Sequence, residues 1–197
     1  MLVAAREAAE ELGFGLYLVG GALRDLLLGR SGPDMDLVVE GDALRLAEAL
    51  AAKLGARAIF HRRFGTAKLH KGSLVMDLAT ARAESYAHPG ALPTVRPGAL
   101  KDDLFRRDFT INAMALGIAG DAAGAIVDPF DSRQDLAARL VRILHPQSFI
   151  DDATRIWRAV RYEQRLGFHI EAETERLLRR DVGMLKTISG PRLRREL

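Results

Sequence analysis

Two aspartates, Asp34 and Asp36, stand one residue apart at the start of a short apolar stretch. In a β-strand, residues i and i+2 project from the same face about 6 to 7 Å apart, so both carboxylates can reach one cation. The sequence contains no cysteine, so a metal ion here must be held by oxygen or imidazole ligands, which favours a hard ion such as Mg²⁺. Asp77, in another predicted strand, offers a third acid.

A glycine pair, Gly20 and Gly21, separates a predicted strand from a predicted helix on the N-terminal side of these acids. Free backbone amides and the helix dipole attract phosphate there, and Arg24, one turn further on, adds a charged donor. A phosphate cradle beside metal-holding acids suggests metal-assisted nucleotidyl transfer. Taken singly, the glycines also fit a plain tight turn, and the acids fit a cap or a loop. Their joint occurrence with strands on both sides is more specific.

The elements that must position these residues follow from the alternation of short apolar runs and helical stretches. Asp42 is a suitable N-cap for the second predicted helix, and Gly55 lies just past its end. The pattern is typical of an α/β or α+β layer. Strands are expected at 16–19, 35–39, 56–61, 66–72 and 73–81, and helices at 22–28 and 43–54.

The second half of the chain changes character twice. Residues 82–101 contain three prolines and two glycines without clear periodicity, which predicts a long loop that becomes ordered on binding. Beyond residue 140, apolar residues repeat every three to four positions, which predicts a second, all-helical unit. The repeat includes Phe149, Ala153, Ile156 and Val160.

Charge is distributed unevenly along the 197 residues. Residues 133–197 carry 14 basic and 9 acidic side chains, whereas residues 1–132 carry 15 and 17. This asymmetry indicates a polyanionic partner for the second part, although a solvated arginine-rich surface would have the same composition. No apolar run approaches the length of a membrane span and no signal peptide is recognisable, so we expect a cytoplasmic protein without a membrane partner.

Five stretches resemble consecutive motifs of the bacterial-type (class II) tRNA nucleotidyltransferase and poly(A) polymerase family. They follow the order and spacing of that family from about residue 16 to the C-terminus. The stretches are VGGALRDLLLG, DMDL, RRDFTINAMAL, VDPFDSRQDL and FIDDATRIWRAVRYEQRLGF.

This resemblance implies roles for individual residues. Asp34 and Asp36 correspond to the metal-binding aspartates of the family, which also carry its catalysis. The triphosphate-binding turn corresponds to Gly20, Gly21 and Arg24. The motif that holds the ribose and phosphates of the incoming nucleotide corresponds to Arg106, Arg107, Asp108 and Asn112. Arginine forks suit phosphate oxygens and a carboxylate suits sugar hydroxyls.

A further motif of the family reads the nucleotide base and corresponds to Asp151, Asp152 and Arg155, with Arg158 and Arg161 continuing it. Asp152 and Arg155 are three residues apart on a predicted helix, so their side chains would be neighbours that present an acceptor and donors to a base edge. Without the family context, the same pair would be a simple helical ion pair. Asp151 departs from the glutamate that is common in the family.

The resemblance implies a mixed sheet of the nucleotidyltransferase type with flanking helices at residues 1–140, followed by a helical neck at 141–197 that is expected to be truncated. It implies an Mg²⁺-dependent enzyme that adds CMP or AMP from CTP or ATP to the 3′ end of tRNA or another RNA and releases pyrophosphate. The product (CCA, CC, a single A or a poly(A) tail) and the oligomeric state remain open. Alternatives are a poly(A) polymerase, a catalytically silent RNA- or nucleotide-binding module, and a small-molecule nucleotidyltransferase.

Overall fold

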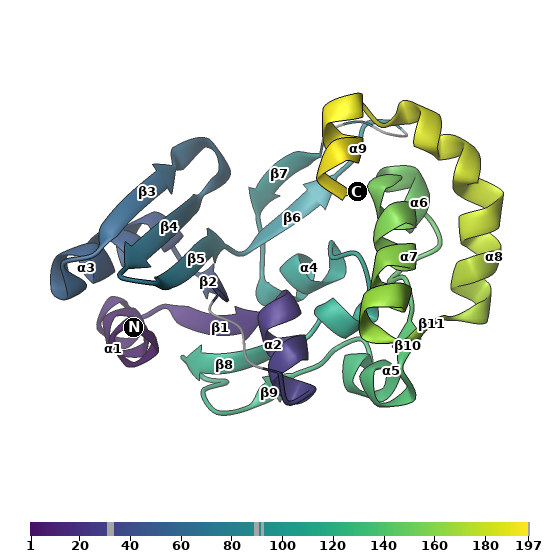
Figure 1. Cartoon of the computed structure of the whole chain (residues 1–197). Helices are drawn as coiled ribbons and strands as arrows, with labels where there is room; N and C mark the ends of the chain where they lie inside the picture. Colours follow the sequence, from purple (N-terminus) through teal and green to yellow (C-terminus); the bar gives the residue numbers. More distant parts are fainter. Residues whose placement is uncertain (31–33, 89–90, 92, 197) are drawn as a thin grey trace.

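A computed structural model describes residues 1–30, 34–88, 91 and 93–196. It is a mixed α/β fold whose main element is a seven-stranded sheet with the order β3-β4-β5-β2-β1-β8-β9 (Figure 1). Neighbouring strands are antiparallel except β2 and β5, which run parallel. The strands are β1 (Gly15–Val19), β2 (Asp34–Glu40), β3 (Arg57–His61), β4 (Thr66–Lys71), β5 (Leu74–Thr80), β8 (Ala115–Ala119) and β9 (Ile126–Val127).

Helices α1 (Leu2–Leu12) and α3 (Ala43–Leu54) pack on one face of this sheet. The bounds of α3 confirm the predicted helix: the carboxylate of Asp42 accepts hydrogen bonds from the amides of Leu44 and Arg45, and Gly55 ends the helix at a φ of 59°. Glycine adopts this left-handed conformation without the steric cost that a Cβ atom imposes.

The two faces of β2 differ because side chains alternate along a strand. Leu37 and Val39 are buried with the α1 and α3 side chains, whereas Val38 packs with Leu100 and Leu104 of α4 (Leu100–Phe105). Asp36 shares the parity of Val38 and therefore lies on the α4 side of the sheet. Helix α2 (Gly20–Leu27) follows β1 directly and starts two residues earlier than predicted.

The predicted loop over residues 82–101 is wrong. Strand β6 (Arg82–Ser85) pairs with β7 (Thr94–Pro97) in an antiparallel ribbon, and α4 begins at Leu100. The loop was predicted from the prolines and glycines of this segment. Pro97 is nevertheless compatible with a strand, because it lies at the end of an exposed two-stranded ribbon, where its missing amide removes no required hydrogen bond.

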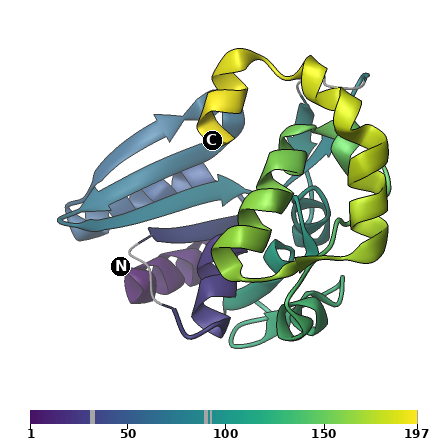
Figure 2. The ribbon, with the colours of Figure 1, turned by 45° about the vertical axis from the view of Figure 1, so that its right-hand side comes forward.

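The C-terminal part is mainly helical, and its core is continuous with that of the sheet. Short strands β10 (Leu140–Val141) and β11 (His169–Ile170) pair in parallel within it, so this part is not all-helical as predicted. Figure 2 shows α7 between the sheet and α8, with the final helix turning back toward the sheet. The helical elements are α5 (Ser132–Ala138), α6 (Ser148–Asp151), α7 (Thr154–Leu166), α8 (Ala172–Asp181), η3 (Val182–Thr187) and α9 (Gly190–Glu196); two short turns, η1 (Arg62–Phe64) and η2 (Thr110–Asn112), lie earlier in the chain.

No helix among the described residues combines the length and apolar character needed to cross a membrane.

Candidate active site

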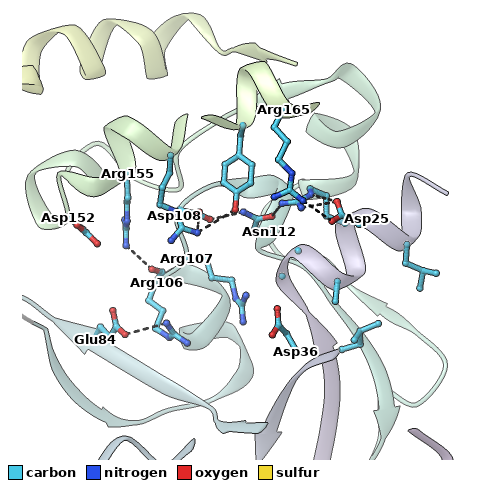
Figure 3. A pocket seen from close by; sticks show the side chains of 18 of the residues that line it. Asp25, Asp36, Glu84, Arg106, Arg107, Asp108, Asn112, Asp152, Arg155 and Arg165 are labelled. Atoms are coloured by element: carbon cyan, nitrogen blue, oxygen red, sulfur yellow. Dashed lines mark hydrogen bonds and ion pairs between the residues drawn. The ribbon is translucent and has the colours of Figure 1, made fainter. Parts of the chain in front are cut away.

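A cavity of about 900 Å³ opens between the sheet, helix α2 and helix α7. Its described lining carries eight arginines and five acidic residues, so the cavity is basic overall and suits a polyphosphate. Figure 3 shows side chains from the sheet, from the Arg106–Asp108 segment and from α7 directed into one space. The cavity brings together most of the residues predicted from the sequence: Gly20, Gly21, Arg24, Asp36, Arg106, Arg107, Asp108, Asn112, Asp152, Arg155 and Arg158.

The glycine turn allows a close approach between α2 and Arg107. Gly20 has a φ of 66°, and a Cβ atom placed there would lie 2.8 Å from Nη1 of Arg107 and 4.0 Å from Oδ2 of Asp36. The predicted phosphate-binding turn, a basic side chain and a candidate metal ligand therefore meet at one point (Figure 3).

A chain of two hydrogen bonds and one ion pair runs across the cavity from α2 to α7. Nη1 of Arg24 donates to Oδ1 of Asn112 (2.7 Å), and Nδ2 of Asn112 donates to Oδ1 of Asp108 (2.9 Å). Oδ2 of Asp108 lies 2.6 Å from Nη2 of Arg158. Burial lowers the pKa of Arg158, but Asp108, Tyr162 and Glu196 together more than offset this, so its pKa is raised overall. Arg158 is therefore a permanent cation.

The two arginines of the RRD segment are held by an acid that the sequence analysis missed. The fully buried carboxylate of Asp103 accepts from Nη2 of Arg106 at 2.6 Å and from Nη2 of Arg107 at 2.9 Å. The sequence contained a signal for these ion pairs, because an acidic residue three or four positions before a basic residue on a helix lies next to it. Asp103 fixes both guanidinium groups at the cavity wall.

The β6–β7 ribbon supplies a second missed acid, Glu84. Its side chain is 7% exposed, and Oε1 lies 3.0 Å from Nη2 of Arg82 and 3.3 Å from Nη1 of Arg106. The hydroxyl of Tyr86 donates to Oε2 at 3.0 Å. Burial and the neighbouring charge of Glu84 raise the pKa of Tyr86 to about 12, so Tyr86 stays a neutral donor.

The predicted base-reading residues are arranged differently from the prediction. Helix α6 ends at Asp151 and α7 begins at Thr154, so Asp152 and Arg155 do not share a helix as predicted. Asp152 has extended backbone angles, and its Oδ1 accepts from the amide and hydroxyl of Thr154 and from Nη2 of Arg192. An aspartate that hydrogen-bonds to the backbone two residues further on favours a non-helical conformation, which explains the break.

Two predicted residues lie beside the cavity rather than in its described lining. Oδ2 of Asp151 is 3.8 Å from Nε2 of His145, and Nη2 of Arg161 is 2.9 Å from Oε2 of Glu196. Their assignment to nucleotide recognition stays a prediction. Lining residues that the prediction did not name are Leu18, Ala22, Asp25, Leu26, Arg30, Met35, Glu84, Tyr86, Pro93, Tyr162, Arg165 and Arg192.

Of the two candidate metal ligands, the structure describes only the side chain of Asp36. Asp36 is exposed and lines the cavity, whereas the side chain of Asp34 lies outside the described residues. The β2–β5 register places Asp36 beside Asp77, whose Oδ2 is 2.7 Å from Nζ of Lys68. Among the described side chains, no group of three or more histidines and acids is placed to hold a metal ion.

Comparison with known proteins relates the sequence of this chain to one protein family and to curated tRNA nucleotidyltransferases. The family profile "Poly A polymerase head domain" matches residues 16–142. An A-adding tRNA nucleotidyltransferase of Geobacter sulfurreducens is 45% identical over 194 residues, covering 97% of this chain and 22% of the relative. A CC-adding tRNA nucleotidyltransferase of Deinococcus radiodurans is 44% identical over 158 residues, covering 78% and 41%.

Solved structures agree with these relatives. A crystal structure of a tRNA nucleotidyltransferase with a primer tRNA and an incoming ATP analog superposes with a TM-score of 0.89 at 44% identity, covering 98% of this chain and 54% of that one. The chain thus spans less than half of these two curated relatives and about half of the solved structure.

Proposed function

Because the chain belongs to the poly A polymerase head domain family, we propose that it is the nucleotide-transferring part of a template-independent RNA nucleotidyltransferase. It adds CMP, AMP or both from CTP and ATP to the 3′ end of tRNA. The relatives that are A-adding and CC-adding tRNA nucleotidyltransferases support this choice of substrates. Within the chain, we assign transfer to residues 1–140 and base recognition to residues 141–197.

The observation that carries the proposal is the meeting of three chemistries in one cavity. The turn at Gly20 offers backbone amides, Arg107 lies against it, and Asp36 faces the same point. Arginine forks and helix N-termini bind phosphate oxygens. This arrangement is what a nucleoside triphosphate with its divalent counter-ion requires.

Asp34 and Asp36 are assigned to hold Mg²⁺. The donor set fits, because the described ligand is an exposed carboxylate beside a basic cavity, and magnesium is held by one or two carboxylates together with substrate phosphates. When bound, such an ion activates the attacking hydroxyl and stabilises the leaving pyrophosphate. The residues of the chain orient the nucleotide around it.

In this proposal, the segment from Arg106 to Asn112 binds the phosphates and the sugar of the nucleotide. Arg106 and Arg107 are fixed by Asp103 and can clamp phosphates without losing further side-chain entropy. Both described contacts of Oδ1 of Asp108 come from donors of the same segment, Phe109 and Asn112. Asp108 is assigned to the ribose hydroxyls, and the ion pair between its buried Oδ2 and Nη2 of Arg158 fixes the carboxylate toward α7.

In this proposal, Asp152 and Arg155 bind the base of the nucleotide. Oδ1 of Asp152 is occupied by Thr154 and Arg192, which leaves Oδ2 as the acceptor for an exocyclic amino group. Cytosine and adenine both carry such a group, whereas uracil does not. Arg155 supplies the donors.

The experiment is to incubate the protein with tRNAs that lack the terminal A, CA or CCA and to supply each labelled nucleotide separately. We expect incorporation of CMP or AMP, or both in succession, with release of pyrophosphate. Nucleotide binding without incorporation on any tRNA or other RNA would favour the silent module. Incorporation of a long run of A on any RNA would identify a poly(A) polymerase.

A further inference from the structure

The guanidinium of Arg155 is held by two neutral oxygens. Nη1 donates to Oγ of Ser148 at 2.7 Å, and Nη2 donates to the backbone carbonyl oxygen of Arg106 at 2.8 Å. Arg155 is 5% exposed and Ser148 is fully buried. Figure 3 shows the contact between Arg155 and Arg106 at the wall of the cavity.

This setting distinguishes Arg155 from six of the seven other arginines of the cavity; the seventh, Arg30, is exposed. Within the described part of the chain, six of them lie within ion-pair distance of a carboxylate, whereas Arg155 does not. The six are Arg24, Arg106, Arg107, Arg158, Arg165 and Arg192. Arg155 is therefore a buried cation whose charge is not neutralised by a direct partner.

Such an arrangement costs free energy, because a buried charge is normally paired. A neutral hydroxyl and a carbonyl orient the guanidinium without neutralising its charge. Its remaining N–H groups are left as donors for another acceptor. A base edge that carries ring nitrogen and carbonyl acceptors is the ligand that such donors fit. A carboxylate partner would have oriented the side chain equally well but would have weakened it as a donor to a neutral base.

Ser148 also contacts the second base-reading residue. The backbone amide of Asp152 donates to the carbonyl oxygen of Ser148 at 3.2 Å. One residue at the start of α6 thus holds the acceptor residue through its main chain and the donor residue through its hydroxyl.

We propose that Ser148 is a positioning residue for base selection: its hydroxyl, together with the carbonyl of Arg106, fixes Arg155 as a charged, pre-oriented donor to the nucleobase. The inference rests on the proposed function, in which Arg155 reads the base. Ser148 does not contact the nucleotide. Its effect is therefore expected on the discrimination between bases and not on the capture of the triphosphate.

The test compares Ser148→Ala with Ser132→Ala. Ser132 is also fully buried, its Oγ has no hydrogen-bond partner among the described residues, and it does not line the cavity. Calorimetric titrations with Mg²⁺ and non-hydrolysable analogs of CTP, ATP, UTP and GTP give the discrimination, and inorganic tripolyphosphate reports the phosphate site alone. Ser148→Cys keeps the size of the side chain with a weaker acceptor and carries the test if Ser148→Ala does not fold.

We expect Ser148→Ala to reduce the preference for CTP or ATP over UTP and GTP by about tenfold or more, the value of a hydrogen bond to a charged group, with tripolyphosphate affinity unchanged. The nucleotide preference of Ser148→Cys should lie between those of Ser148→Ala and the unmodified protein. The preference of Ser132→Ala should match that of the unmodified protein. Full discrimination in Ser148→Ala, or an equal loss for all ligands, would overturn the inference. Failure of the unmodified protein to bind any nucleotide or tripolyphosphate would instead overturn the proposed function.

Discussion

Arg24 and Asn112 are 88 residues apart in the chain, yet Nη1 of Arg24 donates to Oδ1 of Asn112 at 2.7 Å in the buried wall of the cavity. The contact joins α2, which carries the glycine turn, to the segment that follows the two arginines Arg106 and Arg107. Asn112 also donates to Asp108, so this amide couples α2 to the side of the cavity formed by α7.

Asn112→Ala should therefore loosen both sides. It removes an acceptor from Arg24, which is 2% exposed, and a donor from Asp108. We expect a loss of about 1 to 3 kcal/mol in the free energy of unfolding, measured by urea denaturation, and weaker tripolyphosphate binding in calorimetry. Unchanged stability and affinity would show that Asp25 alone is enough to hold Arg24.

Gly20→Ala should abolish close packing at the glycine turn. Gly20 has a φ of 66°, and the new Cβ would lie 2.8 Å from Nη1 of Arg107. Gly29→Ala is the matched control, because Gly29 has a φ of 71° and open space around it. Both variants should lose about 1 to 2 kcal/mol from the backbone conformation, but only Gly20→Ala should lose triphosphate affinity. Equal affinity in the two variants would contradict the assignment of this turn.

Asp103→Asn should disturb both arginines of the RRD segment at once. The carboxylate is fully buried and pairs with Arg106 and Arg107, so its neutralisation should cost about 3 to 5 kcal/mol together with nucleotide affinity. Asp102→Asn is the neighbouring control, since Asp102 accepts only from the amide of Ala99 at the start of α4 among its described contacts and should cost about 1 kcal/mol or less. Thermal unfolding and nucleotide titration of both variants decide this. Similar losses in both would contradict the clamp.

The stability of the fold should fall as the pH drops below the ordinary histidine range. Burial and then the charge of Arg155 lower the pKa of His145 below its ordinary value of 6.5. At pH values between the pKa of His145 in the folded chain and its ordinary pKa in the unfolded chain, the unfolded chain binds a proton that the folded chain does not. Acidification therefore favours unfolding. His145→Gln should flatten the dependence of the unfolding free energy on pH below pH 6.5, whereas His169→Gln, at an exposed position, should not. Parallel curves for all three proteins would rule this out.

The parts of the fold that the sequence predicted are those with local signals. The helix at 43–54 has an N-cap at Asp42 and a glycine at its end, and both function as predicted. Short apolar runs predicted the strands around Asp36. These signals depend on neighbours in the chain, so they survive without knowledge of the tertiary contacts.

The parts that were missed depend on contacts between distant segments. Glu84 acts on Arg106, 22 residues away, and Ser148 acts on Arg155 from another helix. Neither belongs to a recognisable motif, because a residue that holds an arginine needs only an acceptor in the right place. The break between Asp151 and Thr154 was missed because apolar spacing continues across it, whereas the extended backbone of Asp152 interrupts the helix.

The central claim is that Asp34 and Asp36 hold the divalent ion that brings a nucleoside triphosphate into the cavity. The direct measurement is calorimetric titration of CTP and ATP analogs with and without Mg²⁺, for the unmodified protein and for the double variant Asp34→Ala, Asp36→Ala. We expect magnesium-dependent binding that the double variant loses while its melting temperature is retained within a few degrees. Undiminished magnesium-dependent binding by a folded double variant would contradict the claim.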